Sequence, residues 1–259
     1  MARFVSLALL LGIVVAFASG ALERGLIYPF DATRNPPPPG FSETDLATGD
    51  GETLVVWSAP PAPGRPTLLY FNGNAGNLAD REVRFGAFTK AGYGLVAAGY
   101  RGSSGSTGKP SEPALIGDAE RLAEALPALA GPGPVIYYGE SLGAAVAIAL
   151  AEHRAPAALV LEAPFASIAA MAGVLYDTEA PARLARAKWP NVTRIAAVTA
   201  PLFILHGEID AVVPPAQGRA VFEAAGSLDK TFYLVAGAGH VNAWQPDAQR
   251  RLHAFLGRF

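Results

Sequence analysis

Ser141 lies between two glycines in the stretch 139–143, Gly-Glu-Ser-Leu-Gly, and its setting suggests a nucleophile. The apolar run 134–138 before it is typical of a buried parallel strand, and the alanine-rich run 144–152 after it is typical of a closely packed helix. A G-x-S-x-G pattern between a strand and a helix predicts a nucleophile elbow, where glycines let the two backbones approach. The turn would hold the hydroxyl at the N-terminus of the helix, where partial positive charge favours a developing anion. Five residues can match this loose pattern by chance, but the strand–turn–helix setting favours a catalytic serine.

Polar clusters also follow three other predicted strands. They are 72–77 after the strand 67–71, 206–210 after the strand 202–205, and 237–240 after the strand 231–235. Ligands of open parallel sheets bind beyond the carboxyl ends of the strands, so we expect these clusters and Ser141 at one edge of the sheet. The chain order of Ser141, Asp210 and His240 is the triad order of the α/β-hydrolase fold.

The expected roles follow from acyl-transfer chemistry. A serine hydroxyl is a weak nucleophile that needs an adjacent base, and the sequence predicts His240 for this role. Asp210 would fix the tautomer of the imidazole and stabilise its positive charge. The attacked carbonyl becomes an oxyanion, which needs backbone donors already in place. The expected donors are the N–H groups of Leu142, next after the nucleophile, and of Asn74, in the loop after the early strand.

Other acidic residues compete for the orienting role. Glu208 is the rival of Asp210, and Glu162, at the end of another predicted strand, is an outside candidate. Asp118 falls inside a predicted helix, where an acidic residue is usually solvated or caps the helix.

The other histidines receive structural interpretations. His206 follows a strand, but a second catalytic histidine is unnecessary, so we expect it to be structural. His153 and His253 lie on predicted helices away from the strand ends and are expected at the surface. The four histidines lack the paired spacing of zinc ligands, so no metal is implied. The sequon Asn191-Val192-Thr193 is a weak indication of glycosylation.

Composition excludes several functional classes. The 259 residues suit one large α/β domain, and 51% of them are hydrophobic. A net charge of −2 gives no basic surface for nucleic acid. Without cysteine, a disulfide framework, a thiol nucleophile or a thiolate metal site is impossible. The predicted chemistry needs no cofactor.

The alternation of strands and helices predicts an α/β fold with a mostly parallel central sheet covered on both faces. We expect Leu54 to Trp57 as an edge strand, Ser111 as the N-cap of a helix with Pro113 in its first turn, and the irregular segment 167–199 as a small cap over a site. The remaining predicted strands are 95–98 and 158–161, and the remaining helices are 77–91, 215–225 and 246–259. Residues 27–259 would form one domain.

The N-terminal segment, residues 1–26, contains an uncharged run from Phe4 to Leu22. At about 1.5 Å per residue this run nearly spans a hydrocarbon core of about 30 Å, so we favour an uncleaved membrane anchor. Arg3 would hold the N-terminus in the cytoplasm and place the catalytic domain on the other side, although Arg24 weakens this orientation. A cleaved signal with a site at Ala16-Phe17-Ala18 is the alternative, and it would yield a secreted or periplasmic protein.

The loop 70–77, Tyr-Phe-Asn-Gly-Asn-Ala-Gly-Asn, resembles the H-G-N-A-G-N loop of Bem46-like α/β hydrolases, which are related to ABHD-type membrane hydrolases. The resemblance runs from Tyr28 to the C-terminus, and the other matching segments are Tyr28-Pro29, 100–112, the elbow, 162–165, 206–214 and Gly239-His240. It favours Asp210 over Glu208 as the acid and supports the anchor. Asn72 stands where the family usually has histidine, and Ser104 replaces a small residue or glycine. Neither departure touches the triad.

The resemblance implies a serine hydrolase of acyl esters or thioesters, since family members act on lysophospholipid, acylglycerol or protein-palmitoyl substrates. A small-molecule or lipid-like acyl substrate is therefore expected. The alternatives are a peptidase-like amide hydrolase and a catalytically silent scaffold or binding protein on the same fold.

Overall fold

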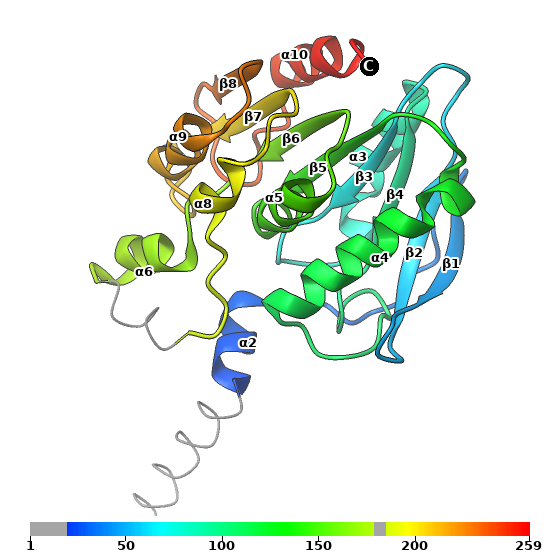
Figure 1. Ribbon diagram of the computed structural model, residues 1–259, viewed down its shortest axis with the longest axis horizontal. Helices are drawn as coiled ribbons and strands as arrows, with labels where there is room; N and C mark the ends of the chain where they lie inside the picture. The colour runs from blue at the N-terminus through cyan, green and yellow to red at the C-terminus, as the bar shows by residue number, and fades with distance from the viewer. Residues whose placement is uncertain (1–19, 179–184) are drawn as a thin grey trace, which may run out of the picture.

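The computed structural model describes residues 20–178 and 185–259, and within them eight strands form one sheet in the order β1-β2-β4-β3-β5-β6-β7-β8 (Figure 1). Neighbouring strands from β4 to β8 are parallel, whereas β2 is antiparallel to both β1 and β4. The strands are β1 Ser42–Ala47, β2 Thr53–Ala59, β3 Thr67–Phe71, β4 Gly94–Ala98, β5 Val135–Glu140, β6 Ala158–Glu162, β7 Leu202–Gly207 and β8 Lys230–Val235. The expected α/β-hydrolase fold with a mostly parallel sheet is confirmed.

Helices cover both faces of this sheet. The described helices are α2 Ala21–Ile27, η1 Ala79–Arg81, α3 Glu82–Lys90, α4 Glu112–Ala130, α5 Leu142–His153, α6 Ile168–Tyr176, α8 Asn191–Ile195, α9 Pro215–Ala224 and α10 Pro246–Leu256. One core lies between the sheet and the helices α4, α5, α8 and α9, and the other lies between the sheet and the helices α3 and α10. In Figure 1, α4 and α5 lie over the face of the sheet that is turned toward the viewer.

Helix α5 is buried on nearly all sides, because it packs on β5 and also contacts α4 and α8. The five alanines among residues 144–151 permit this close approach. As predicted, Ser111 caps α4, and its Oγ accepts a hydrogen bond from the N–H of Ala114 at 3.3 Å.

The expectation of an edge strand at Leu54 to Trp57 is wrong, since β2 lies inside the sheet and β1 forms the edge. The sequence of β1, Ser-Glu-Thr-Asp-Leu-Ala, buries only Leu46 and therefore carries almost no apolar signal. The segment 167–199 is also less irregular than expected, because it contains α6 and α8.

Three polar residues differ from their sequence expectations. Asp118 is buried and paired with Arg101 at 2.7 Å instead of being solvated. His253 is half-buried and stacks on Tyr93 with 5.8 Å between ring centroids. Asn191 of the sequon is fully buried, and its amide donates to the carbonyl oxygen of Phe165 at 2.9 Å, so it is closed to a glycan in the folded chain.

The predicted anchor lies, up to residue 19, outside the described residues. Within residues 20–178 and 185–259, no helix has the length and apolar character needed to cross a bilayer. The expected boundary between residues 26 and 27 falls inside α2.

Candidate active site

Ser141 occupies a tight turn between β5 and α5, with φ 49° and ψ −110°. Residues other than glycine rarely adopt these backbone angles. The surrounding structure must therefore hold the turn in this conformation. A Cβ on Gly139 would lie 2.3 Å from the carbonyl oxygen of Gly143, and a Cβ on Gly143 would lie 2.0 Å from that of Phe71. Both glycines are therefore required by close backbone approach, as the elbow pattern predicts.

The strands around this turn, β3, β5 and β6, end at the same edge of the sheet. Phe71 at the end of β3 pairs with Gly139, and Glu140 pairs with Glu162 at the end of β6. This register brings the loop after β3 and the turn after β5 to one edge of the sheet.

His240 and Asp210 contact each other at this edge. Nδ1 of His240 lies 2.7 Å from Oδ2 of Asp210, and the Asp210 side chain is fully buried while that of His240 is 18% exposed. The backbone N–H groups of Val212 and Val213 donate to Oδ1 of Asp210 at 2.9 and 2.8 Å. Burial raises the pKa of this carboxyl, but the hydrogen bonds from His240 and Val213 outweigh burial and lower the pKa below its ordinary value.

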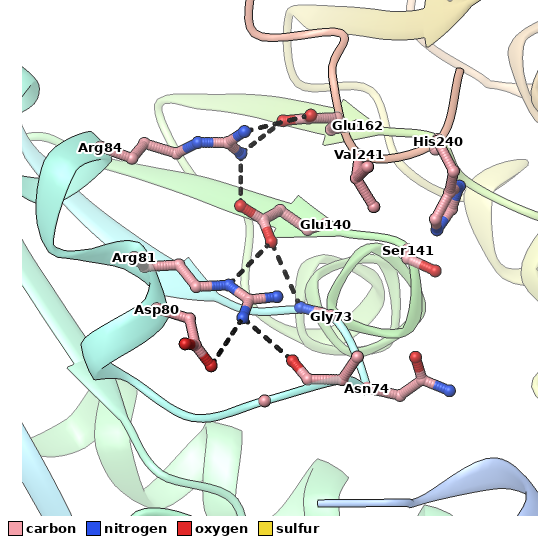
Figure 2. A pocket seen from close by; sticks show the side chains of 13 residues that line it. Gly73, Asn74, Asp80, Arg81, Arg84, Glu140, Ser141, Glu162, His240 and Val241 are labelled. Carbon is pink, nitrogen blue, oxygen red and sulfur yellow. Dashed lines mark hydrogen bonds and ion pairs between the residues drawn. The ribbon is translucent and has the colours of Figure 1, made fainter. Parts of the chain in front are cut away.

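Ser141 and His240 line one cavity of about 380 Å³ (Figure 2). No hydrogen bond joins the two side chains within the described residues, although both are turned into the same cavity (Figure 2). Such contacts are often loose before substrate binds. The N–H of Leu142 belongs to the first residue of α5 and so has no acceptor within the helix.

The loop 72–77 forms another part of the cavity wall. Gly73 and Asn74 line the cavity, and the Asn74 side chain is turned to the carbonyl oxygen of Ile27 at 3.1 Å. Asn72, which stands where the family usually has histidine, donates to the carbonyl oxygen of Gly73 at 2.9 Å. Asn72 Oδ1 is buried without a hydrogen-bond partner among the described residues.

The competing residues have other partners. Glu208 accepts from the N–H of Gly237 at 2.9 Å, at the base of the loop that carries His240. His206 is fully buried, with Nε2 2.8 Å from the carbonyl oxygen of Val213 and 3.5 Å from Asp210. Burial lowers the pKa of His206. Within the described residues, no group of three potential ligands is arranged to hold a metal.

A charged wall of the cavity was missed from the sequence. It consists of Asp80, Arg81, Arg84, Glu140 and Glu162. Arg84 contacts Glu140 and lies 2.6 Å from Glu162, and Arg81 lies 3.3 Å from Glu140. The position of Glu140 within the elbow and the spacing of three between the arginines were the available signals, but a helical spacing alone does not show which way side chains point.

Comparison with known proteins supports this assignment of the fold. The family model described as "Serine aminopeptidase, S33" matches residues 65–193 and 184–243. An uncharacterized protein of Mycobacterium tuberculosis is 36% identical, over 88% of this chain and 86% of the relative. Protein bem46 of Schizosaccharomyces pombe is 32% identical over 82% of this chain and 77% of the relative. Lysophosphatidylserine lipase ABHD12 of Rattus norvegicus is 31% identical over 80% of this chain and 60% of the relative.

Solved structures share the same architecture at lower identity. The Pyrococcus furiosus esterase Pf2001 superposes with a TM-score of 0.72 at 19% identity, over 90% of this chain and 99% of that one. An alpha-beta hydrolase from Vibrio vulnificus superposes with a TM-score of 0.73 at 18% identity, over 93% and 91% of the two chains. With the family model and these relatives in agreement with the elbow and the loop 72–77, the chain belongs to the Bem46-like, ABHD-type family of α/β hydrolases.

Proposed function

We propose that the protein is a serine-dependent hydrolase of carboxylic esters or thioesters, with Ser141, His240 and Asp210 as its catalytic triad. The observation that carries this proposal is the 2.7 Å contact between His240 and the buried Asp210, beside a cavity that Ser141 also lines. Family membership supports the hydrolase class, and the rat relative's name brings a lipid-like acyl substrate into the proposal.

In the proposed mechanism, Oγ of Ser141 attacks the carbonyl carbon of the ester while His240 Nε2 takes the hydroxyl proton. The N–H groups of Leu142 and Asn74 hold the oxyanion that forms. As the tetrahedral intermediate collapses, the imidazolium gives its proton to the leaving alcohol or thiol. A water molecule, deprotonated by His240, then attacks the acyl carbon; the bond from that carbon to Oγ breaks, the carboxylic acid leaves, and the imidazolium returns its proton to Oγ of Ser141. Asp210 keeps Nδ1 protonated and stabilises the charged imidazole throughout.

The direct test replaces Ser141 with alanine. The Ser141→Ala variant should remain folded and lose ester hydrolysis by several orders of magnitude, about 10⁶-fold by analogy with triad knockouts. Initial rates on 4-nitrophenyl butyrate measure the loss, and circular dichroism checks the fold. A variant with more than a tenth of wild-type activity contradicts the assignment.

A fluorophosphonate probe separates this proposal from the catalytically silent alternative. An active serine hydrolase becomes labelled at Ser141, whereas a scaffold does not react. The description of the matching family model also names an aminopeptidase, so amide substrates belong in the same assay. Hydrolysis of an aminoacyl-4-nitroanilide at a higher rate than the matched ester would move the assignment to the peptidase alternative.

We further propose that residues 1–26 anchor the protein in a membrane, with the catalytic domain on the extracytoplasmic side. The uncharged run from Phe4 to Leu22 supports this proposal. Mass spectrometry of the full-length protein from its native membrane should find the N-terminal segment intact. A mature N-terminus at Ser19 in the soluble fraction would instead establish a cleaved signal.

A further inference from the structure

The charged wall of the cavity is not required for attack on an ester carbonyl. Its two arginines come from the end of η1 and from α3, and its two glutamates come from the ends of β5 and β6. Because burying charges is costly unless they are paired, the partners of each arginine show which one has donors left for a ligand.

Both terminal nitrogens of the Arg84 guanidinium have partners. It contacts Glu140 through Nη1, and the same nitrogen lies 2.6 Å from Oε2 of Glu162. Its Nη2 donates to the other oxygen of Glu162 at 3.3 Å, and its guanidinium lies 4.6 Å from the ring centroid of Trp244. Arg84 therefore holds the wall together.

Arg81 has a nitrogen left over. Its Nε donates to Glu140 at 3.3 Å and its Nη1 donates to the carbonyl oxygen of Ala75 at 2.9 Å. Among the described residues, its Nη2 makes no hydrogen bond. A Cβ built on Gly73 would lie 3.6 Å from this nitrogen and 3.7 Å from Cβ of Ser141, so the two groups flank the same glycine. Figure 2 shows this end of the guanidinium pointing toward Gly73.

Arg81 is largely buried among charges of both signs, and its Nη1 lies 3.8 Å from Oδ2 of Asp80. Burial lowers the pKa of its guanidinium, Asp80 raises that pKa in part, and Arg84 lowers it again. Glu140, the carboxylate nearest to Arg81 Nε, also accepts hydrogen bonds from the N–H of Gly73 and from Arg84, so Arg81 shares this partner. A ligand oxyanion would complete the hydrogen bonding of Arg81 and offset its charge.

We infer that Arg81 binds an anionic group of the substrate, so that the preferred esters carry a carboxylate or phosphate a few bonds from the scissile carbonyl. The inference rests on the proposed ester hydrolysis at Ser141. A guanidinium suits this role because its planar donors match the oxygens of both anions. Nη2 of Arg81 and the side chain of Ser141 lie close together on either side of Gly73. The anionic group and the scissile carbonyl of the substrate should therefore be separated by only a few bonds.

Four esters test the inference on the full chain. They are neutral 4-nitrophenyl butyrate, mono-4-nitrophenyl glutarate with a carboxylate on the acyl group, 3-carboxy-4-nitrophenyl butyrate with a carboxylate on the leaving group, and cationic butyrylcholine. Values of kcat/KM are measured for wild type, Arg81→Gln, Arg81→Lys and the control Arg121→Gln. Arg121 is a partly exposed arginine on α4, so this control removes the same charge far from the wall. Ratios compared between variants cancel the intrinsic reactivity of each ester.

We expect Arg81→Gln to lower the ratio of anionic to neutral kcat/KM by about tenfold or more, mainly through KM, for at least one of the two anionic esters. The affected ester shows whether the anion belongs to the acyl group or to the leaving group. Arg81→Lys should keep part of the preference, and Arg121→Gln should keep all of it. Inhibition of butyrate ester hydrolysis by inorganic phosphate or by acetate, weakened in Arg81→Gln, identifies the preferred oxyanion.

Two results overturn the inference while ester hydrolysis stands. One is an equal loss on all esters in Arg81→Gln, which would mean that Arg81 only braces the loop through the carbonyl of Ala75. The other is a wild-type preference for butyrylcholine that Arg81→Gln leaves unchanged. If the Ser141→Ala variant hydrolyses every ester as fast as wild type does, the proposed function itself is refuted.

Discussion

At the residue scale, Asp210 accepts hydrogen bonds from His240 and from two backbone N–H groups. Its carboxylate is thus oriented from two sides, one by the loop that contains it and the other by the imidazole. Glu208 is two residues away, but it accepts a hydrogen bond from the backbone N–H of Gly237. Asp210 therefore contacts the imidazole, whereas Glu208 contacts the loop that carries it.

The Asp210→Asn variant should lose about 10³- to 10⁴-fold in kcat, because an amide that donates to Nδ1 favours the wrong tautomer of His240. Glu208→Gln, which retains an acceptor oxygen for Gly237, should stay within a few-fold of wild type. Steady-state kinetics on 4-nitrophenyl butyrate compares the two. If Glu208→Gln is the more damaging change, Glu208 is the orienting acid.

Glu140 should make stability depend on pH. Burial, and then the charge of Glu162, raise the pKa of its carboxyl in the folded chain, so between its unfolded and folded pKa values the folded state holds the extra proton. This contribution to stability is complete below the unfolded pKa and is lost as the pH rises toward the folded pKa. The Glu140→Gln variant resembles the protonated carboxyl and should therefore gain stability relative to wild type as pH rises above about 4.5. Urea unfolding from pH 5 to pH 8 measures the difference, and a difference that is flat with pH contradicts the prediction.

At the scale of elements, the elbow depends on glycines whose missing side chains let β5, α5 and β3 meet. Gly143→Ala places a methyl group 2.0 Å from the carbonyl oxygen of Phe71. It should cost about 1–3 kcal/mol or more of unfolding free energy and abolish ester hydrolysis, because the strand and helix must separate.

The matched control is Gly117→Ala on the exposed face of α4, where a Cβ would meet nothing within 4 Å. This variant should gain about 0.5–1 kcal/mol, since alanine is the better helix former. Chemical denaturation and ester assays of both variants check the contrast. Equal effects from the two substitutions would show that backbone crowding at the elbow is not the cause.

The elements that could be predicted from the sequence are those whose conformation depends mainly on their own residues. The strand β3 was predicted at its observed residues, because an unbroken apolar run between breakers has few other structures open to it. β1 was missed because an edge strand with mostly exposed polar residues has no such pattern. Asp118 was misread because its partner Arg101 lies in a loop that only the tertiary structure brings beside α4. The charged wall was missed for the same reason, since Glu140 meets Arg81 and Arg84 across two different elements.

At the scale of the whole molecule, α2 and the residue after it contact residues that follow 184. The Glu23 carboxylate accepts hydrogen bonds from the N–H groups of Arg186 and Ala187, both at 2.7 Å. Tyr28, just after α2, accepts a hydrogen bond from Nε1 of buried Trp189 at 3.2 Å. Residues 23–28 and the segment before α8 are therefore held together.

Glu23→Ala should weaken this connection, because two backbone donors lose their acceptor. The expected loss is about 1 kcal/mol of unfolding free energy, with faster trypsin cleavage after Arg186. Glu23→Gln keeps an acceptor oxygen and should fall between alanine and wild type. Denaturant titration and limited proteolysis measure both effects, and identical behaviour of the two variants would show that these hydrogen bonds do not matter.

The unusual backbone angles of Ser141 have a consequence for how this chain evolves. Glycine adopts such angles without strain, so Ser141→Gly should raise the unfolding free energy by about 1 kcal/mol after the entropy cost of glycine. Thermal unfolding of the glycine and alanine variants tests this, with the glycine variant expected to be the more stable. Selection for stability alone would thus replace the serine in a lineage that had lost its activity.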